Sequence, residues 1–192
     1  MYCLPLSLNY LMNLYFLRHA SAGTRRSNPV VDARRPLDKE GKQQCMFIGN
    51  FLNSLNVQFD LIASSPLKRA RQTASFVGTE VGYEAEILVT EALSPDATIQ
   101  QFEDLLSHLG ESEEGQPELE NVLLVGHNPN FPAFLGIVCS SGKANLRMRK
   151  GAIARVDVTR RPGTLHWLVD PRILRGVYRK ATRRSRRKTS RK

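Results

Sequence analysis

Cysteine is scarce in this sequence, and its three positions lie far apart. Cys3, Cys45 and Cys139 form no CxxC motif and no paired spacing, so the pattern offers neither a zinc site nor a disulfide framework. Cys45 and Cys139 lie in apolar, helix-like stretches, where a buried and unreactive thiol is the common case. We therefore expect reduced cysteines in a protein of the cytoplasm.

Long hydrophobic runs are also missing, since none reaches the length that crosses a bilayer. Residues 1–11 are apolar, but they contain Pro5, lack a positively charged start and show no small-residue cleavage site, so they make a poor signal peptide. We interpret residues 1–12 as an N-terminal extension, either a dispensable flap or the product of a start codon set too early. A membrane anchor is the less favoured alternative, and we expect no membrane contact.

Acidic residues are absent after Asp170. Eleven of the 28 Lys and Arg residues fall within residues 172–192, and without them 17 basic residues face 18 acidic ones, so the formal charge of +10 belongs to the C-terminal end. We predict one folded domain over residues 13–171 and a disordered basic tail over residues 172–192. Two interpretations of the tail stay open: salt-sensitive contact with a polyanion, or a solubilising end without a partner.

A short apolar run that ends in an Arg-His pair is the feature around which the chain is organised. Residues 14–17 have the composition of a buried strand, Arg18 and His19 follow, and small residues occupy positions 20–23. In open α/β sheets ligands bind beyond the carboxyl ends of the strands. This pattern predicts that Arg18 and His19 lie in a crevice.

A second predicted strand, residues 59–64, leads directly into a helix. Ser65 stands at the expected N-cap and Pro66 in the first turn, the position that proline tolerates best. Arg69 then falls in the first helical turn, close to the end of the strand. Arg71 lies about 200° further round the helix and is expected to point elsewhere.

A third predicted strand, residues 122–126, repeats the opening pattern, because it ends in Gly126 followed by His127. A lone histidine at such a place is more often structural than catalytic, but this one stands in the same topological position as His19. Around these strands we predict a polar loop over residues 24–35, helices from Asp38 and over residues 98–109 and 130–139, a short strand over residues 86–89, and a hairpin of residues 151–158 and 164–170.

Two arginines and two histidines at three strand ends suit a phosphoryl dianion. Arginine stays charged and offers a planar fork of donors to phosphate oxygens, and a neutral imidazole can attack phosphorus and later depart. The sequence has no P-loop, no acidic metal cage and no zinc-like spacing. The phosphate charge must then be neutralised by arginine, and we expect no metal and no cofactor.

Four motifs in this order resemble the histidine phosphatase superfamily, the RHG-motif phosphatases and phosphoglycerate mutases, and most of all its compact SixA-type phosphohistidine phosphatases. The resemblance covers residues 13–171. It implies an α/β fold, a three-layer α/β/α sandwich with a mostly parallel central sheet. The motifs are Leu17-Arg18-His19-Ala20, Arg35-Pro36-Leu37, the run from Ser64 through Arg69 to Ala74, and Val125-Gly126-His127-Asn128-Pro129.

The resemblance also implies roles for the matching residues. His19 would be the nucleophile that is transiently phosphorylated, while Arg18, Arg69 and His127 would bind the phosphoryl group and stabilise its transferring oxygens. Arg35 would be an additional phosphate contact. Water would then release phosphate from His19.

The chain departs from the superfamily pattern at the general acid. Mutases and many phosphomonoesterases of the superfamily carry a glutamate two residues after a leucine of the mid-chain loop, but here Leu93-Ser94 is followed by Pro95. Asp96 and Glu91 are possible substitutes, although we favour Asp96 as the N-cap of the helix over residues 98–109. Because a poor leaving group needs a proton, the missing glutamate favours a labile substrate such as phosphohistidine.

The sequence therefore predicts a metal-independent, SixA-like phosphatase that acts on phosphohistidine proteins through a covalent intermediate on His19. The alternative within the superfamily is a phosphomonoesterase for a small sugar or nucleotide phosphate. An alternative of another class is a binding protein on this scaffold, tethered to nucleic acid by its basic tail. The oligomeric state stays open.

Overall fold

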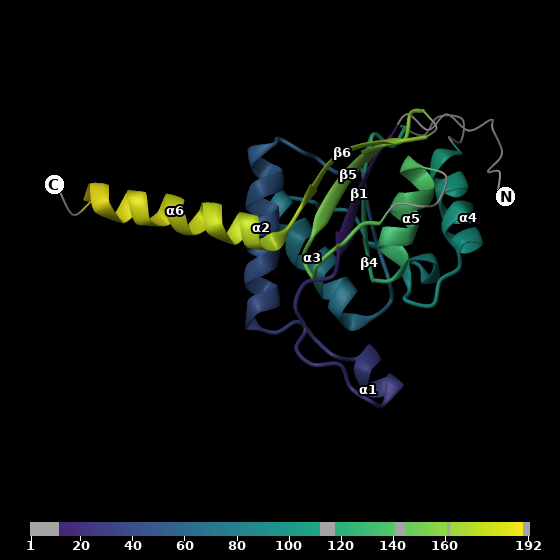
Figure 1. Ribbon diagram of the computed structural model, residues 1–192, viewed down its shortest axis with the longest axis horizontal. Coiled ribbons are helices and arrows are strands. Elements are labelled where there is room, and N and C mark those ends of the chain that lie inside the picture. Colours follow the sequence, from purple (N-terminus) through teal and green to yellow (C-terminus); the bar gives the residue numbers. More distant parts are fainter. Residues whose placement is uncertain (1–11, 112–117, 141–144, 161, 190–192) are drawn as a thin grey trace.

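The strand that carries the Arg-His pair lies inside a mixed six-stranded sheet, with the order β3-β2-β4-β1-β5-β6. The computed structural model describes residues 12–111, 118–140, 145–160 and 162–189 (Figure 1). The strands β1 to β4 run parallel, β5 is antiparallel to β1, and β6 is antiparallel to β5. The strands are β1 (Asn13–Arg18), β2 (Leu61–Ser64), β3 (Leu88–Val89), β4 (Asn121–Gly126), β5 (Ile153–Asp157) and β6 (Thr164–Val169).

Two hydrophobic cores, one on each face of the sheet, follow from the alternation of side chains along the strands. Leu14 and Phe16 of β1 face the core beneath α4 (Ile99–Gly110) and α5 (Asn130–Cys139). Tyr15 and Leu17 face the core beneath α2 (Lys39–Ser54) and α3 (Lys68–Val81). The two helical layers are separate in Figure 1, and the predicted three-layer α/β/α sandwich is confirmed.

The register of the parallel strands brings their carboxyl ends to one edge of the sheet. Arg18 of β1 stands opposite Gly126 of β4, and Ser64 of β2 stands opposite Val125. Gly151, with a φ of +76°, precedes β5 and donates its backbone N–H to the carbonyls of Arg18 and His19. The residues that follow β1, β2 and β4 therefore lie together.

Several predicted helix boundaries are confirmed by their caps. Asp38 is the N-cap of α2 and accepts a 2.7 Å hydrogen bond from the backbone of Gly41, as expected for an N-cap carboxylate. Gly82 ends α3 in the left-handed conformation that glycine adopts readily. The helix α5 has the bounds predicted for residues 130–139.

Three local predictions are wrong. The predicted loop over residues 24–35 contains the short helix α1 (Pro29–Ala33). The helix α3 has Leu67 at its N-cap instead of Ser65, whose hydroxyl has a tertiary partner described below. Thr98, and not Asp96, caps α4, because its hydroxyl and the side chain of Gln101 form a reciprocal capping box.

The prediction of a disordered tail is also wrong for most of its length, because the helix α6 spans Pro171–Thr189. Leu174 of its first turns is buried against the core shared with α2, and the ring of Tyr178 lies 4.7 Å from that of Phe47 on α2. These apolar contacts pack the first turns of α6 against the body of the protein. Beyond them α6 projects from the body (Figure 1). Contact between this basic helix and a polyanion stays a prediction.

The predicted extension over residues 1–12 lies, except for Met12, outside the described residues. Met12 itself is buried and packs in the core beneath α4 and α5. Within the described part of the chain, every helix is too short or too polar to cross a membrane.

Candidate active site

His19 lies immediately beyond β1 and is almost fully buried, with 5% of its surface exposed. Its backbone N–H donates to the carbonyl of Gly126 over 2.9 Å, so the turn after β1 is fastened to the end of β4. The ring Nδ1 lies 2.8 Å from the carbonyl oxygen of Ala20. Because a carbonyl can only accept, Nδ1 carries the proton and Nε2 keeps its lone pair.

His127 occupies the corresponding position after β4. Its ring centroid lies 4.9 Å from that of His19, with the two ring planes inclined by 52°. Its Nε2 lies 2.9 Å from the hydroxyl oxygen of Ser65, which follows β2. Gly126 permits this arrangement, because a Cβ on it would lie 2.5 Å from the ring of Phe131.

Both imidazoles are held in the neutral form. Burial lowers the pKa of His19 well below its ordinary value, and His127, Arg69 and Arg18 add repulsion. Burial also lowers the pKa of His127, to about 3, with further repulsion from Arg69, Arg18 and Arg35. A neutral imidazole is the form that can attack phosphorus.

Arg18 and Arg69 bring positive charge to the two histidines. The Nη1 of Arg18 donates to the carbonyl of Met148 over 2.8 Å, and Arg69, in the first turn of α3, is 6% exposed. The Nε of each arginine is buried and has no hydrogen-bond partner among the described residues. Since buried donors are almost always satisfied, two such donors in a pocket of positive charge point to an anionic ligand.

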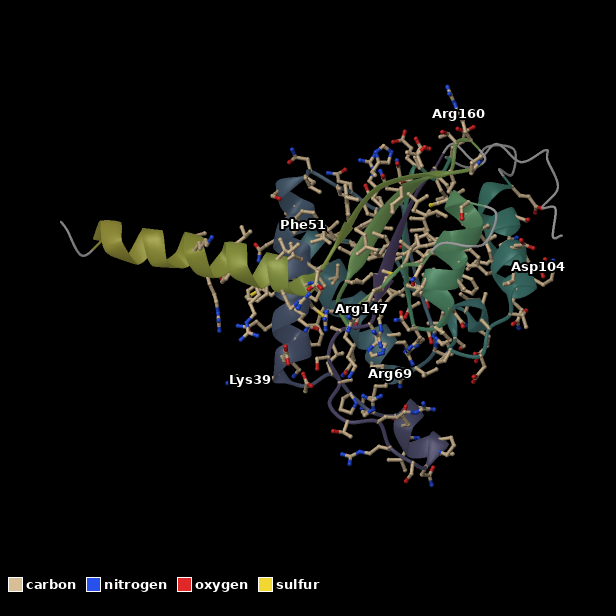
Figure 2. The ribbon with its side chains drawn as sticks, viewed as in Figure 1. Lys39, Phe51, Arg69, Asp104, Arg147 and Arg160 are labelled. Carbon is tan, nitrogen blue, oxygen red and sulfur yellow. The ribbon has the colours of Figure 1, made fainter. Side chains whose placement is uncertain are left out.

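Arg35 and Arg69 meet on one carboxylate, that of Asp32 in α1. Arg35 Nε lies 2.9 Å from Asp32 Oδ1, and Arg69 Nη1 lies 3.3 Å from Asp32 Oδ2. The hydrogen bond from Arg35 is the largest cause that lowers the pKa of Asp32, to about 2. Figure 2 shows Arg69 at the end of the sheet from which α1 projects. Asp32 therefore fixes the position of both guanidinium groups.

The two candidate acids, Glu91 and Asp96, are exposed, whereas His19, Arg69 and His127 are buried. Glu91, in the 3₁₀ helix Glu91–Leu93, is exposed and accepts a hydrogen bond from the hydroxyl of Ser94. Asp96 is exposed in the following turn. Their loop lies beside the end of β4, because Asn130 Nδ2 donates to the carbonyls of Ser94 and Ala97. The structure records no hydrogen bond from either acid to His19 or His127, and a role as general acid stays a prediction.

Sequence reasoning missed Asp32 and the role of Ser65. The signal for Asp32 was an acid three residues before Arg35 in an otherwise basic loop, a spacing at which side chains on a helix can pair. For Ser65 the sequence predicts only a helix cap. No three His, Cys, Asp or Glu side chains of the described ranges gather as metal ligands.

The family model of the histidine phosphatase superfamily (branch 1) matches residues 14–95. An uncharacterized protein of Picosynechococcus sp. is 34% identical over 121 residues, which cover 62% of this chain and 68% of that protein. The chain belongs to the histidine phosphatase superfamily. The matched segment contains Arg18, His19, Arg35 and Arg69, and His127 lies beyond it.

Other similarities extend over most of this chain. The phosphohistidine phosphatase SixA of Escherichia coli is 26% identical over 161 residues, which cover 83% of this chain and 94% of that one. The structure of the protein histidine phosphatase SixA complexed with tungstate has a TM-score of 0.72 at 26% identity and covers 85% of this chain and 99% of that one. A phosphoglycerate mutase from Bacillus anthracis shares the fold, with a TM-score of 0.64 at 15% identity over 85% of this chain and 95% of that one.

The buried neutral histidines predict a loss of stability in mild acid. The folded-state pKa of His127, about 3, lies below the unfolded value of about 6.5. The unfolded chain therefore binds more protons than the folded protein as the pH falls below about 6.5. Protonation of His127 in the unfolded chain lowers the free energy of unfolding by about 2 kcal/mol between about pH 7 and pH 5. Denaturant titrations at these two pH values should show that the His127→Asn variant loses correspondingly less stability than the wild type.

This pH window separates the effect of His127 from that of Asp32. The pKa of Asp32 is about 2 in the folded protein and about 3.9 in an unfolded chain, so its contribution to stability is lost only below about pH 4. His108→Asn, at an exposed position on α4, is the matched control and should retain the wild-type dependence. Equal acid sensitivity of the wild type and His127→Asn would contradict the buried neutral state of His127.

Proposed function

We propose that this superfamily member is a SixA-like phosphohistidine phosphatase that hydrolyses phosphohistidine on proteins through a phosphoryl intermediate on His19. The observation that carries the proposal is the buried pair of neutral imidazoles, His19 and His127, beside the unpartnered Nε donors of Arg18 and Arg69. Phosphoryl transfer asks mainly for positioning and electrostatic stabilisation, which these groups supply.

In the first step the lone pair on His19 Nε2 attacks phosphorus, and the P–N bond of the substrate breaks. The positive charge that develops on the His19 ring is stabilised by the Nδ1–H bond to the Ala20 carbonyl. Arg18 and Arg69 offer donors to the equatorial oxygens, with Arg35 as an additional contact. A substrate phosphohistidine that is protonated on its other ring nitrogen leaves as neutral imidazole, so this step needs no proton from the enzyme.

In the second step water attacks the phosphoryl group on His19, the new P–N bond breaks and phosphate leaves. His127 is neutral in the free enzyme, and the negative charge of a bound phosphoryl group would raise its pKa, so that the ring can accept the proton of the attacking water. The hydroxyl of Ser65 at 2.9 Å from Nε2 fixes the ring orientation. None of these steps uses a metal or a cofactor.

The missing glutamate supports phosphohistidine over small phosphomonoesters as the substrate. An alkoxide leaving group needs a general acid, whose contribution is about 10² to 10⁴ in rate. Glu91 is hydrogen bonded to Ser94, and Asp96 is exposed in the next turn. This chain is therefore suited to a leaving group that departs without help, and a phosphomonoesterase for sugar or nucleotide phosphates is the second candidate.

A side-by-side rate comparison tests this assignment. We expect kcat/KM for a phosphohistidine protein to exceed that for sugar and nucleotide monophosphates by about 10²-fold or more, the lower bound of the missing acid's contribution. The His19→Ala variant gives the blank for spontaneous hydrolysis of phosphohistidine. Faster turnover of a monophosphate would replace the proposal by the second candidate.

A further inference from the structure

A groove of about 820 Å³ lies beside the candidate active site. None of Arg18, His19, Arg69 and His127 lines it. Its volume falls in the range of ligand sites, about 300 to 1,000 Å³, and is far larger than one phosphoryl group. We call it the basic groove, and its argument rests on six of its lining residues: Arg34, Lys68, Arg71, Gln72, Glu86 and Val89.

The basic groove is lined by residues of the same helices, α1 and α3, that carry residues of the candidate active site. Lys68, Arg71 and Gln72 lie on one face of α3, at spacings of three and four residues. Lys68 is the sequence neighbour of Arg69, and Arg34, at the end of α1, is the neighbour of Arg35. The ion pair between Arg69 and Asp32 joins these two walls. A peptide in the groove would thus run directly past Arg69 and Arg35 of the candidate active site.

The groove carries an excess of positive charge that the fold does not neutralise. Arg34, Lys68 and Arg71 are exposed, and none forms an ion pair with a carboxylate in the described part of the chain. Glu86 is the single acid among the lining residues. Three cations against one carboxylate favour an acidic occupant.

The far wall of the groove belongs to β3, the edge strand of the sheet. Leu88 and Val89 are 38% and 45% exposed. An exposed sheet edge is a surface on which an extended peptide can lie as an added strand. Both shape and charge therefore fit an extended acidic peptide.

We propose that the basic groove binds an acidic, extended segment of the substrate protein next to its phosphohistidine. This inference rests on the proposed function and adds the substrate class to it. Arg71, which the helical periodicity directs away from Arg69, is then a specificity residue for the protein part of the substrate.

The test uses the double variant Lys68→Gln/Arg71→Gln in the full chain. Its matched control is Lys39→Gln/Arg160→Gln, which removes the same charge at exposed positions outside the lining of the groove. Figure 2 shows Arg160 at the opposite end of the molecule from Arg69. Two phosphohistidine peptides are compared, one flanked by Asp and Glu and one by Asn and Gln. A small phosphoramidate measures the chemistry without a peptide.

For the wild type we expect kcat/KM to be about 3- to 10-fold higher for the acidic peptide, since exposed ion pairs contribute modestly. The groove variant should lose this preference and keep its rate on the phosphoramidate, while the control variant should keep both. High salt should remove the preference as well. Equal rates of the wild type on both peptides, or an equal loss on both in the groove variant, would overturn the inference.

A binding measurement separates this inference from the proposed function. An unphosphorylated acidic peptide should bind the wild type several-fold more tightly than the groove variant, whether or not phosphohistidine is the substrate. If the peptide binds in this way but phosphohistidine is not hydrolysed, the proposed function is wrong and the inference of acidic-peptide binding in the groove holds. If phosphohistidine is hydrolysed but the acidic peptide binds the wild type and the groove variant equally, the groove inference fails alone.

Discussion

The His19→Ala variant is expected to lose turnover by about 10⁴-fold or more, because removal of a covalent nucleophile eliminates the pathway instead of weakening one contact. His19 Nε2 is the ring nitrogen with a free lone pair, since Nδ1 donates to the carbonyl of Ala20. The neighbouring His127 has its Nε2 hydrogen bonded to Ser65, and we expect that it does not replace His19 as the nucleophile. Steady-state assays on a phosphohistidine substrate measure the loss.

His108→Ala, at an exposed position in the last turn of α4, is the matched control and should keep wild-type activity. Thermal unfolding of both variants separates catalysis from folding. Retention of more than a small fraction of the wild-type rate by His19→Ala would mean that water, or another residue, attacks the substrate directly.

Replacing Arg69 by glutamine should reduce kcat/KM by about 10² to 10³-fold, the usual consequence of removing one preorganised donor to a developing anion. The guanidinium of Arg69 is buried, and its Nε has no partner among the described residues. Inhibition by inorganic phosphate, the product of the proposed reaction, should weaken in parallel. Steady-state kinetics with a small phosphoramidate measure both effects.

Arg69→Gln also leaves the carboxylate of Asp32 without one of its partners, so denaturant titration must accompany the kinetics. Arg71→Gln, two positions further along α3 and exposed, is the control and should keep the wild-type rate on the small substrate. If Arg69→Gln lost stability alone and kept its kcat/KM, Arg69 would be a structural ion-pair residue.

The strand ends of the site could be predicted because each carries a local signal. The apolar run that ends at Arg18-His19 and the one that ends at Gly126-His127 indicate buried strands. The carboxyl ends of parallel strands lie on the same side of a sheet, which brings these residues together. The register of Arg18 opposite Gly126 gives this arrangement. The identity of the family came from motifs in their order, and the superfamily match agrees with it.

The contacts that could not be predicted join segments far apart in sequence. Asp32 reaches Arg69 across 37 positions, and Ser65 reaches His127 across 62. No local pattern encodes such pairs, because a short polar side chain can bond its own backbone equally well. The helix α6 was missed for a related reason: its composition favours disorder, and contacts such as Tyr178 on Phe47 override that tendency.

The central claim is that His19 carries the phosphoryl group during turnover. The most direct measurement is rapid quenching of wild-type enzyme with a radiolabelled phosphohistidine substrate, followed by peptide mapping of the protein-bound label. We predict acid-labile, base-stable phosphate on the peptide that contains His19, and none on that peptide in His19→Ala. Label on another residue, or turnover by the wild type with no protein-bound phosphate at any quench time, would contradict the account.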